Sequence, residues 1–186
     1  MKKLLLIFLV CLSACAGKES LIEGQLPDAS YDNEFVYLVP FKGASKKTVD
    51  STLIRESRFL FKIKPEKQNR VYIIRVKPAL RLLLQDILII PEQGTVFVNM
   101  DKNSSSSGTP LNLTLQQWKE RKLVLDTTYY SLRRRYKQTT DEAEKNQLQT
   151  ELDSIIKENR AYMDSLAKKN KDNPVGQLIK SLQPEK

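Results

Sequence analysis

The chain has 186 residues, with 31 Lys and Arg against 22 Asp and Glu, for a net charge of +9 at pH 7. It has no histidine, and its only two cysteines, Cys11 and Cys15, lie near the N-terminus. Ser-His-Asp and Cys-His catalysis, thiol redox chemistry and the usual zinc sites all need residues that are missing. We therefore expect no catalytic, cofactor or metal site, and a protein that is not an enzyme.

Residues 1–14 are predicted to be a lipoprotein signal peptide. Lys2 and Lys3 precede an apolar run over 4–12, which is shorter than the roughly 20 residues that cross a bilayer. The ending "LSAC" resembles the bacterial lipobox, in which the cysteine is acylated, with palmitate for example, and becomes the first residue of the mature chain. Cys15 is thus the expected lipid attachment site, Cys11 is removed, and residues 15–20 form a tether. The alternative is an ordinary signal peptide that contains cysteines by chance.

A lipid at Cys15 predicts a membrane partner and a place in the cell envelope. Several acyl chains on one residue give stable anchoring, and we expect the outer membrane, at its periplasmic or its surface face. Export makes nucleic acid an unexpected partner, although the chain stays basic without Lys2 and Lys3. The densest basic run, Arg133 to Arg135, fits a solvated helix face better than a lipid or polysaccharide site.

Residues 21–110 are predicted to form a β domain. Short runs of β-branched and aromatic residues are separated by turn residues, at 35–39, 49–54, 57–63 and 70–76. In the third run, Phe59, Phe61 and Ile63 alternate with polar or exposed positions, which predicts one buried face. About seven strands without intervening helices favour an antiparallel sandwich or an open barrel.

The end of this domain suggests a further hairpin and a loop. In "DILIIPEQGTVFVNM" (86–100), Pro91 favours a turn and Gly94 can supply a positive φ, so two paired strands are predicted. Residues 101–110 are polar and rich in serine, and we expect a loop there.

Residues 111–170 are predicted to form an antiparallel helical hairpin. Mostly apolar residues recur at alternating intervals of four and three over 111–136, and again over 148–166. The second pattern does not continue the spacing of the first, which favours two helices over one. Between them, Thr139 and Glu142 have the spacing of a capping box. If the chain turns there, residues that face each other across the two helices have numbers with a constant sum, which places Asn159 opposite Trp118. The Asn159 side chain could then accept a hydrogen bond from the indole N–H of Trp118. A short helix over 172–182 follows, with Asn173 as its cap and Pro174 in its first turn.

Several turn motifs together resemble a known family. "VDSTLIRESRFLFKI" (49–63) is similar to a DS-x-x-x-x-D-G-x-F-x-F hairpin, and "PEQGTVFVNM" followed by "SGTPLN" (107–112) is similar to an E-x-G…GT-x-x-N ending. They resemble the N-terminal domain of unknown function of Bacteroidetes lipoproteins, which precedes a thioredoxin-like disulfide reductase domain. Glu56-Ser57 replace the usual Asp-Gly, which predicts a turn of a different type, and the chain ends at Lys186 without a Cys-x-x-Cys.

These observations favour a non-enzymatic binding or scaffold module whose partner is a protein or a glycan. The resemblance implies an alternative, an accessory or truncated member of a thioredoxin-like system without its own redox site. Four short Asp-Ser/Thr motifs fit an O-glycosylation pattern, and Ser51 and Thr127 are the candidate sites among them.

Overall fold

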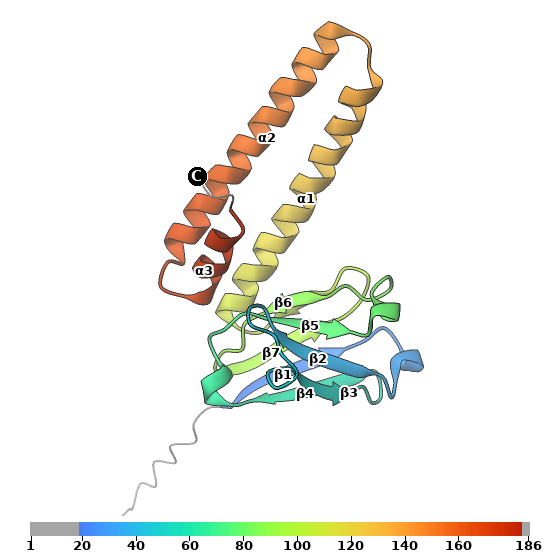
Figure 1. Ribbon diagram of the computed structural model, residues 1–186, viewed down its shortest axis with the longest axis vertical. Coiled ribbons are helices and arrows are strands. Elements are labelled where there is room, and N and C mark those ends of the chain that lie inside the picture. Colours follow the sequence, from blue (N-terminus) through green and yellow to red (C-terminus); the bar gives the residue numbers. More distant parts are fainter. Residues whose placement is uncertain (1–18, 184–186) are drawn as a thin grey trace, which may run out of the picture.

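A computed structural model describes residues 19–183 as a two-sheet β domain that carries a long helical arm (Figure 1). The first sheet has the order β4-β1-β7-β8, and the second the order β3-β2-β5-β6. The strands are β1 (Ser20–Gln25), β2 (Phe35–Pro40), β3 (Asp50–Leu53), β4 (Arg58–Ile63), β5 (Tyr72–Val76), β6 (Ile87–Ile89), β7 (Gly94–Asn99) and β8 (Ser105–Ser107). The predicted fold class, a β domain followed by a helical hairpin and a short helix, is confirmed.

One pair of strands departs from the expected antiparallel pattern. β1 pairs with β7 in parallel, with Ser20 opposite Gly94, while every other pairing between these strands is antiparallel. Parallel neighbours need a long connection. Here the whole second sheet and β4 lie between β1 and β7 in the chain.

The predicted hairpin over 86–100 is wrong. β6 pairs with β5 in one sheet, whereas β7 pairs with β1 and β8 in the other. The chain leaves the second sheet after Ile90, which is fully buried against the helical arm, and Pro91 accepts a hydrogen bond from the Asn69 amide. Gly94 does have the expected positive φ, of 107°. The serine-rich segment 101–110 also differs from the prediction, because it contains the short strand β8.

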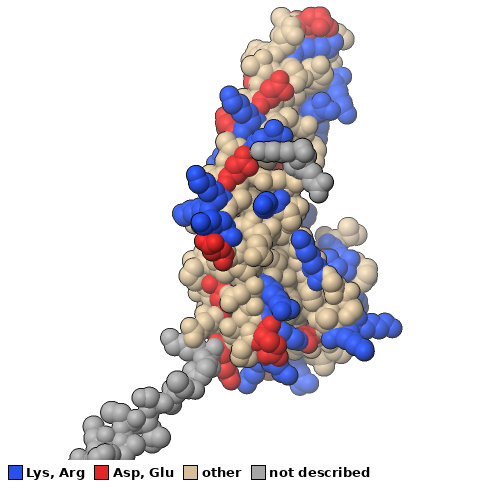
Figure 2. Space-filling view, turned by 60° about the vertical axis from the view of Figure 1, so that its left-hand side comes forward, with Lys and Arg blue, Asp and Glu red and all other residues tan. Residues whose placement is uncertain are grey.

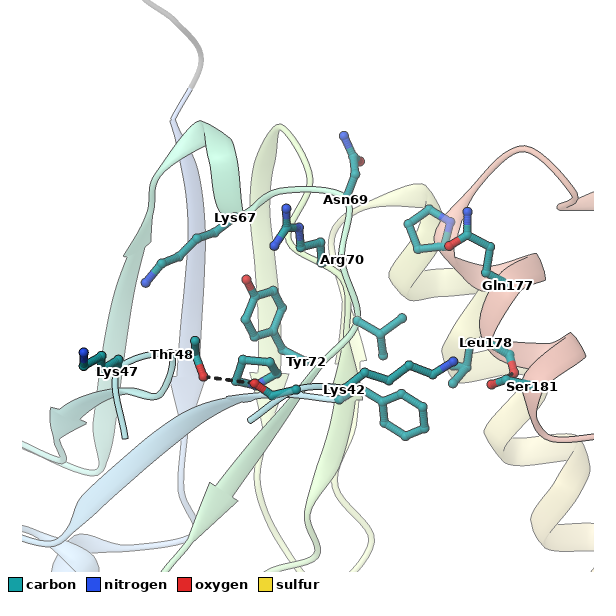
Figure 3. A pocket seen from close by; sticks show the side chains of 15 residues that line it. Lys42, Lys47, Thr48, Lys67, Asn69, Arg70, Tyr72, Gln177, Leu178 and Ser181 are labelled. Atoms are coloured by element: carbon teal, nitrogen blue, oxygen red, sulfur yellow. Dashed lines mark hydrogen bonds between the residues drawn. The ribbon is translucent and has the colours of Figure 1, made fainter. Parts of the chain in front are cut away.

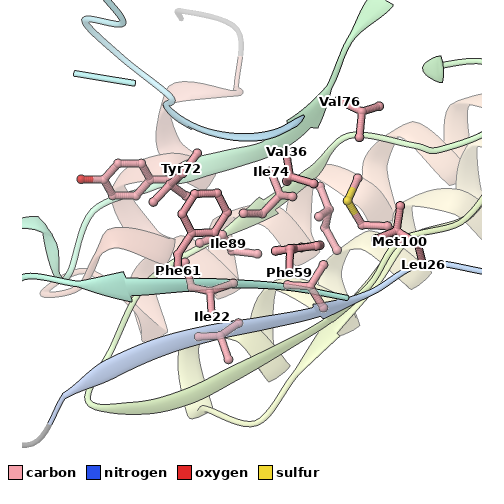
Figure 4. Close-up of a cluster of buried hydrophobic side chains, with 14 of the residues drawn as sticks. Ile22, Leu26, Val36, Phe59, Phe61, Tyr72, Ile74, Val76, Ile89 and Met100 are labelled. Carbon is pink, nitrogen blue, oxygen red and sulfur yellow. The ribbon is translucent and has the colours of Figure 1, made fainter. Parts of the chain in front are cut away.

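The main core lies between the two sheets (Figure 4). Phe59, Phe61 and Ile63 of β4 are buried and the residues between them are exposed, as the alternation predicts. The Phe59 ring lies directly on Gly24 of β1, where an added Cβ would come within 1.9 Å of the ring. Glycine is therefore required there by the close approach of strand and ring.

The turn that joins β3 to β4 also connects the two sheets. Glu56 and Ser57 both have positive φ, 52° and 59°, between the mutually hydrogen-bonded Arg55 and Arg58. This is the type I′ geometry that Asp-Gly also favours. The Asp32 carboxylate accepts hydrogen bonds from the amides of Glu56 (2.9 Å) and Ser57 (2.8 Å), which stabilises the turn without glycine.

Two long helices form the arm, α1 (Pro110–Gln138) and α2 (Glu142–Lys169). They pack antiparallel, and Leu132, Leu148 and Leu152 form a buried cluster near the far end. With a rise of about 1.5 Å per residue, each helix is roughly 40 Å long. The predicted capping box is wrong, because Thr139 ends α1 and Asp141 caps α2 by accepting from the Ala143 amide. The short helix α3 (Pro174–Ser181) begins as predicted, with the Asn173 side chain as its cap.

The base of the arm is joined to the β domain by a buried asparagine. The Asn112 side chain accepts from the Ile90 amide (2.9 Å) and donates to the Ile90 carbonyl (2.6 Å), so it pairs with the strand end as a neighbouring strand would. Glu92 accepts from the Leu111 amide, and an added Cβ at Gly108 would collide with the Thr95 carbonyl. The E-x-G…GT-x-x-N motif therefore forms the junction between sheet and helix.

A second cluster surrounds this junction and includes all three helices. Trp118 lies in it beside Val175, Leu178 and Ile179 of α3. Its indole N–H points to the Met163 sulfur at 3.2 Å, and Asn159 is exposed, so the predicted Trp118–Asn159 pair is wrong. Packing of α3 against both long helices supplies contacts that a two-helix alignment leaves out.

Candidate functional site

A pocket of about 420 Å³ lies between one end of the β domain and α3 (Figure 3). One wall is the segment that follows β2, the second is the segment before β5, and the third is the exposed side of α3. Phe41, Val71 and Leu178 give it an apolar lining that continues into the cluster at the base of the arm. A pocket of this size accepts a small molecule or the end of a glycan.

Backbone hydrogen bonds hold the two loops that supply the charged side chains. The Phe41 amide donates to the Val71 carbonyl (3.0 Å), which extends the pairing of β2 and β5 by one step beyond the sheet. The Asn69 amide donates to the Pro91 carbonyl (2.8 Å). The Ser45 amide donates to the Thr48 hydroxyl (2.8 Å), which closes the loop after β2.

Four cations line the pocket, Lys42 and Lys47 from the first loop and Lys67 and Arg70 from the second. Lys67 forms an ion pair with Asp50. Within residues 19–183, no carboxylate lies within ion-pair distance of Lys42, Lys47 or Arg70. The lining itself contains no Asp or Glu, so the pocket carries a local excess of positive charge.

Tyr72 connects the pocket to the main core. Its side chain is only 4% exposed and its ring packs among the residues between the sheets (Figure 4). Its hydroxyl lies near Lys67 and Arg70 (Figure 3), and no other described residue forms a hydrogen bond with it. Burial raises the pKa of the Tyr72 phenol, and the positive charges of Lys67 and Arg70 act in the opposite direction. The hydroxyl therefore stays protonated near neutral pH and can donate a hydrogen bond.

The remaining polar groups of the pocket suit binding. Asn69 and Gln177 offer amide groups. The Ser181 hydroxyl donates to the Leu178 carbonyl (2.8 Å) and the Thr48 hydroxyl to the Ser45 carbonyl (3.1 Å), so neither is paired with a base that would activate it as a nucleophile. The pocket thus combines cations, hydrogen-bonding groups and an apolar wall.

The candidate sites predicted from sequence lie elsewhere. Cys15 falls outside the described residues. Ser51 is exposed on β3, and Thr127 is exposed on α1, where its hydroxyl donates to the Leu123 carbonyl (2.8 Å). The run Arg133 to Arg135 is exposed at the far end of α1, with Arg135 paired to Glu144 (3.1 Å). Acidic and basic side chains are mixed along the arm (Figure 2), as on a solvated helix surface.

The described residues hold neither a metal-binding cluster nor a membrane-spanning helix. No group of three or more Asp, Glu, His or Cys side chains in the part of the chain from 19 to 183 is arranged to hold a metal ion. None of the described helices is both long and apolar enough to span a membrane.

The sequence reasoning did not find the pocket. Its cations come from "FKGASKK" (41–47) and "KPEKQNRVY" (64–72), two loops that are separate in the chain. The one sequence signal that could have indicated the pocket is that basic residues gather in the turns of the predicted β domain, whereas its strands are apolar.

One of three comparisons with known proteins gives a match. The family model for a domain of unknown function (DUF4369) matches residues 21–115, just over half of the chain. The match runs from β1 to the first turns of α1 and so includes the Asn112 junction. No curated protein and no solved structure matches the chain. The chain belongs to the DUF4369 family.

Proposed function

We propose that this protein is a lipid-anchored protein of the cell envelope, at the outer membrane, that acts as a non-enzymatic binding module. The pocket between the β domain and α3 is the proposed binding site, and a glycan or another small ligand is the proposed partner. One observation carries this proposal. A buried tyrosine presents an unpaired hydroxyl to a pocket in which three of the four cations lack carboxylate partners among the described residues.

This arrangement favours a binding role because the pocket presents donors and positive charge that the described chain leaves without acceptors. The Tyr72 hydroxyl is open to the pocket, and cations that line one cleft attract an anion. A ligand that supplies acceptors can pair with both. The rigid junction at Asn112 keeps the pocket walls in place, because α1 and α3 pack in the same cluster.

Thermal-shift measurements on the purified full-length protein would test the binding role. The panel contains neutral sugars, sugar acids, sugar phosphates, nucleotides and dicarboxylates. Gln177→Trp fills the pocket from α3, and Lys180→Trp places the same ring on the same helix outside the pocket lining. We expect at least one compound to stabilise the wild type and Lys180→Trp but not Gln177→Trp. No stabilisation by any compound, or equal stabilisation of both variants, would contradict the proposal.

The anchor has its own test. We expect Cys15→Ser to leave the precursor unprocessed or to release the protein from membranes, because the thioether sulfur is lost. Mass spectrometry of the mature N-terminus is the measurement. A wild-type product that begins elsewhere and carries no lipid would contradict the proposed anchoring.

The alternative role is tested by co-purification from membranes. A thioredoxin-like protein that co-purifies with the wild type and also with Gln177→Trp would support the accessory role in thiol chemistry.

A further inference from the structure

We propose that the pocket binds a phosphate monoester whose organic part has an apolar face. This inference rests on the proposed binding function and names the ligand class. It follows from three features of the lining, which are the number of cations without partners, the hydroxyl that Tyr72 presents to the pocket and the apolar wall.

The positive charge of the pocket is larger than a ligand with a single negative charge can neutralise. Lys42, Lys47 and Arg70 have no ion-pair partner among residues 19–183, and Lys67 shares its charge with Asp50. A carboxylate would leave two of the first three cations uncompensated. A phosphate monoester carries about −1.5 to −2 charges near pH 7 and three acceptor oxygens, so it can contact several of them at once.

The hydroxyl of Tyr72 and the guanidinium of Arg70 lie on the same side of the pocket. Figure 3 shows the Tyr72 oxygen beside the Arg70 and Lys67 side chains. A planar guanidinium can donate two parallel hydrogen bonds to phosphate. The Tyr72 hydroxyl, which has no described partner, supplies a further donor. We place the phosphate at this end of the pocket.

The opposite side of the pocket has an apolar wall, along which the Lys42 side chain extends toward Leu178 (Figure 3). Phe41, Val71 and Leu178 belong to the partly or fully buried cluster at the base of the arm, and each of them also lines the pocket. A ligand that is only an anion would leave this wall exposed to water. An apolar or flat group attached to the phosphate would cover it, at a gain of roughly 25 cal/mol for each Å² removed from water.

Isothermal titration calorimetry with three simple probes separates these contributions. Phenyl phosphate has both the anion and the ring, glycerol phosphate has the anion alone, and benzyl alcohol has the ring alone. We expect phenyl phosphate to bind the full-length protein about tenfold more tightly than glycerol phosphate, from the area of one ring face. We expect no detectable binding of benzyl alcohol at the same concentrations.

Variants of the pocket assign the binding to named groups. We expect Arg70→Gln to weaken phenyl phosphate binding about tenfold or more, since it removes charge-assisted hydrogen bonds. Tyr72→Phe keeps the ring in the core and removes only the hydroxyl, and we expect several-fold weaker binding with unchanged unfolding. Lys62→Gln, an exposed change on β4 outside the pocket, is the control for general charge and should leave binding unchanged.

The pH dependence distinguishes a phosphate from a carboxylate ligand. The second pKa of a phosphate monoester is about 6, and the protein has no histidine, the side chain that ordinarily changes its charge in this range. Lys42, Lys47, Lys67, Arg70 and Tyr72 line the pocket, and the acids that act on Tyr72 are Asp50 and Glu66. We expect binding of phenyl phosphate to weaken about tenfold from pH 7.5 to pH 5, because the dianion is lost.

Three results would overturn the inference. They are binding that Arg70→Gln and Lys62→Gln affect equally, benzyl alcohol binding as tightly as phenyl phosphate, and citrate or benzoate binding more tightly than phenyl phosphate at pH 7.5. A neutral ligand from the thermal-shift panel that is blocked by Gln177→Trp would leave the binding function standing and reject the phosphate. A panel without any pocket ligand would reject both.

Discussion

The side chain of Asn112, in the first turn of α1, hydrogen-bonds to both the backbone amide and the backbone carbonyl of Ile90 at the end of β6. Both residues are fully buried. The Asn112 amide also donates to the Thr109 hydroxyl at 2.7 Å, so a single side chain joins the strand end, the helix start and the residue that precedes the helix. This contact fixes where the arm leaves the β domain, and with it the wall of the pocket that α3 forms.

We expect Asn112→Leu to destabilise the protein by about 2–4 kcal/mol, since two buried backbone groups lose their partner at about 1–3 kcal/mol each. Urea denaturation followed by circular dichroism measures the change. Asn146→Leu, at an exposed position of α2, serves as the control and should cost less than 0.5 kcal/mol or so. Equal effects of the two substitutions would show that the junction contributes no special stability.

In the β3–β4 turn, a glycine substitution should have the opposite effect on stability from a glycine substitution in the strand beside it. Ser57→Gly should stabilise the protein by about 0.5–1 kcal/mol, because relief of a left-handed backbone outweighs the entropy that glycine adds to the unfolded chain. Ser51→Gly, in the neighbouring strand, should instead destabilise it. Asp32→Ala should cost about 1–3 kcal/mol, since both turn amides lose their acceptor. A neutral Asp32→Ala would mean that water satisfies the turn equally well.

The arm should tolerate changes unequally along its length. Leu152 is 2% exposed inside the distal cluster, whereas Leu125 is half-buried and belongs to none of the buried clusters of the described chain. We expect Leu152→Asp to cost about 2–5 kcal/mol, as for other lost core leucines, and Leu125→Asp to cost about 1 kcal/mol or less. Thermal melts by circular dichroism measure both. Lys157→Asp, at an exposed position of α2, is the control. A larger loss for Leu125→Asp than for Leu152→Asp would contradict the packing.

The single tryptophan reports on the second cluster. Trp118 donates its indole N–H to the Met163 sulfur. Met163→Leu keeps the volume but leaves this donor without a partner, at about 1–3 kcal/mol. We expect a changed emission maximum of Trp118 and a lower unfolding midpoint in the fluorescence-monitored transition. Asn159→Ala should change neither, because Asn159 is exposed. A response to Asn159→Ala alone would restore the pairing that the sequence predicts.

Local patterns predicted those parts of the fold that depend on nearby residues. The alternation in β4 gave its buried face, and the spacing of apolar residues gave two helices and the turn between them. Asn173 and Pro174 gave the start of α3. The N-cap of α2 was predicted wrongly because Thr139 and Asp141, two positions apart, are both typical capping residues. Thr139 ends α1, and Asp141 caps α2.

Contacts between distant segments were not predictable in the same way. Nothing in β6 or β7 alone shows that they belong to different sheets, because Ile90 is diverted to the arm by Asn112, which lies 22 residues further on. The partner of Trp118 is Met163 of α2, which lies one helical turn beyond the predicted Asn159. The candidate pocket has the same origin. Its cations come from two loops and its third wall from α3, and no short motif joins them.

The central claim is that the pocket between the β domain and α3 binds a ligand. Native mass spectrometry of the full-length protein, extracted gently from the membranes of its host, tests this claim most directly. The account predicts that wild type and Lys180→Trp carry an additional small-molecule mass, which is lost on collisional activation. It predicts that Gln177→Trp does not carry this mass. The same additional mass on Gln177→Trp as on wild type would contradict the claim, as would wild-type protein that carries no ligand after extraction and gains none from the panel of sugars and phosphates.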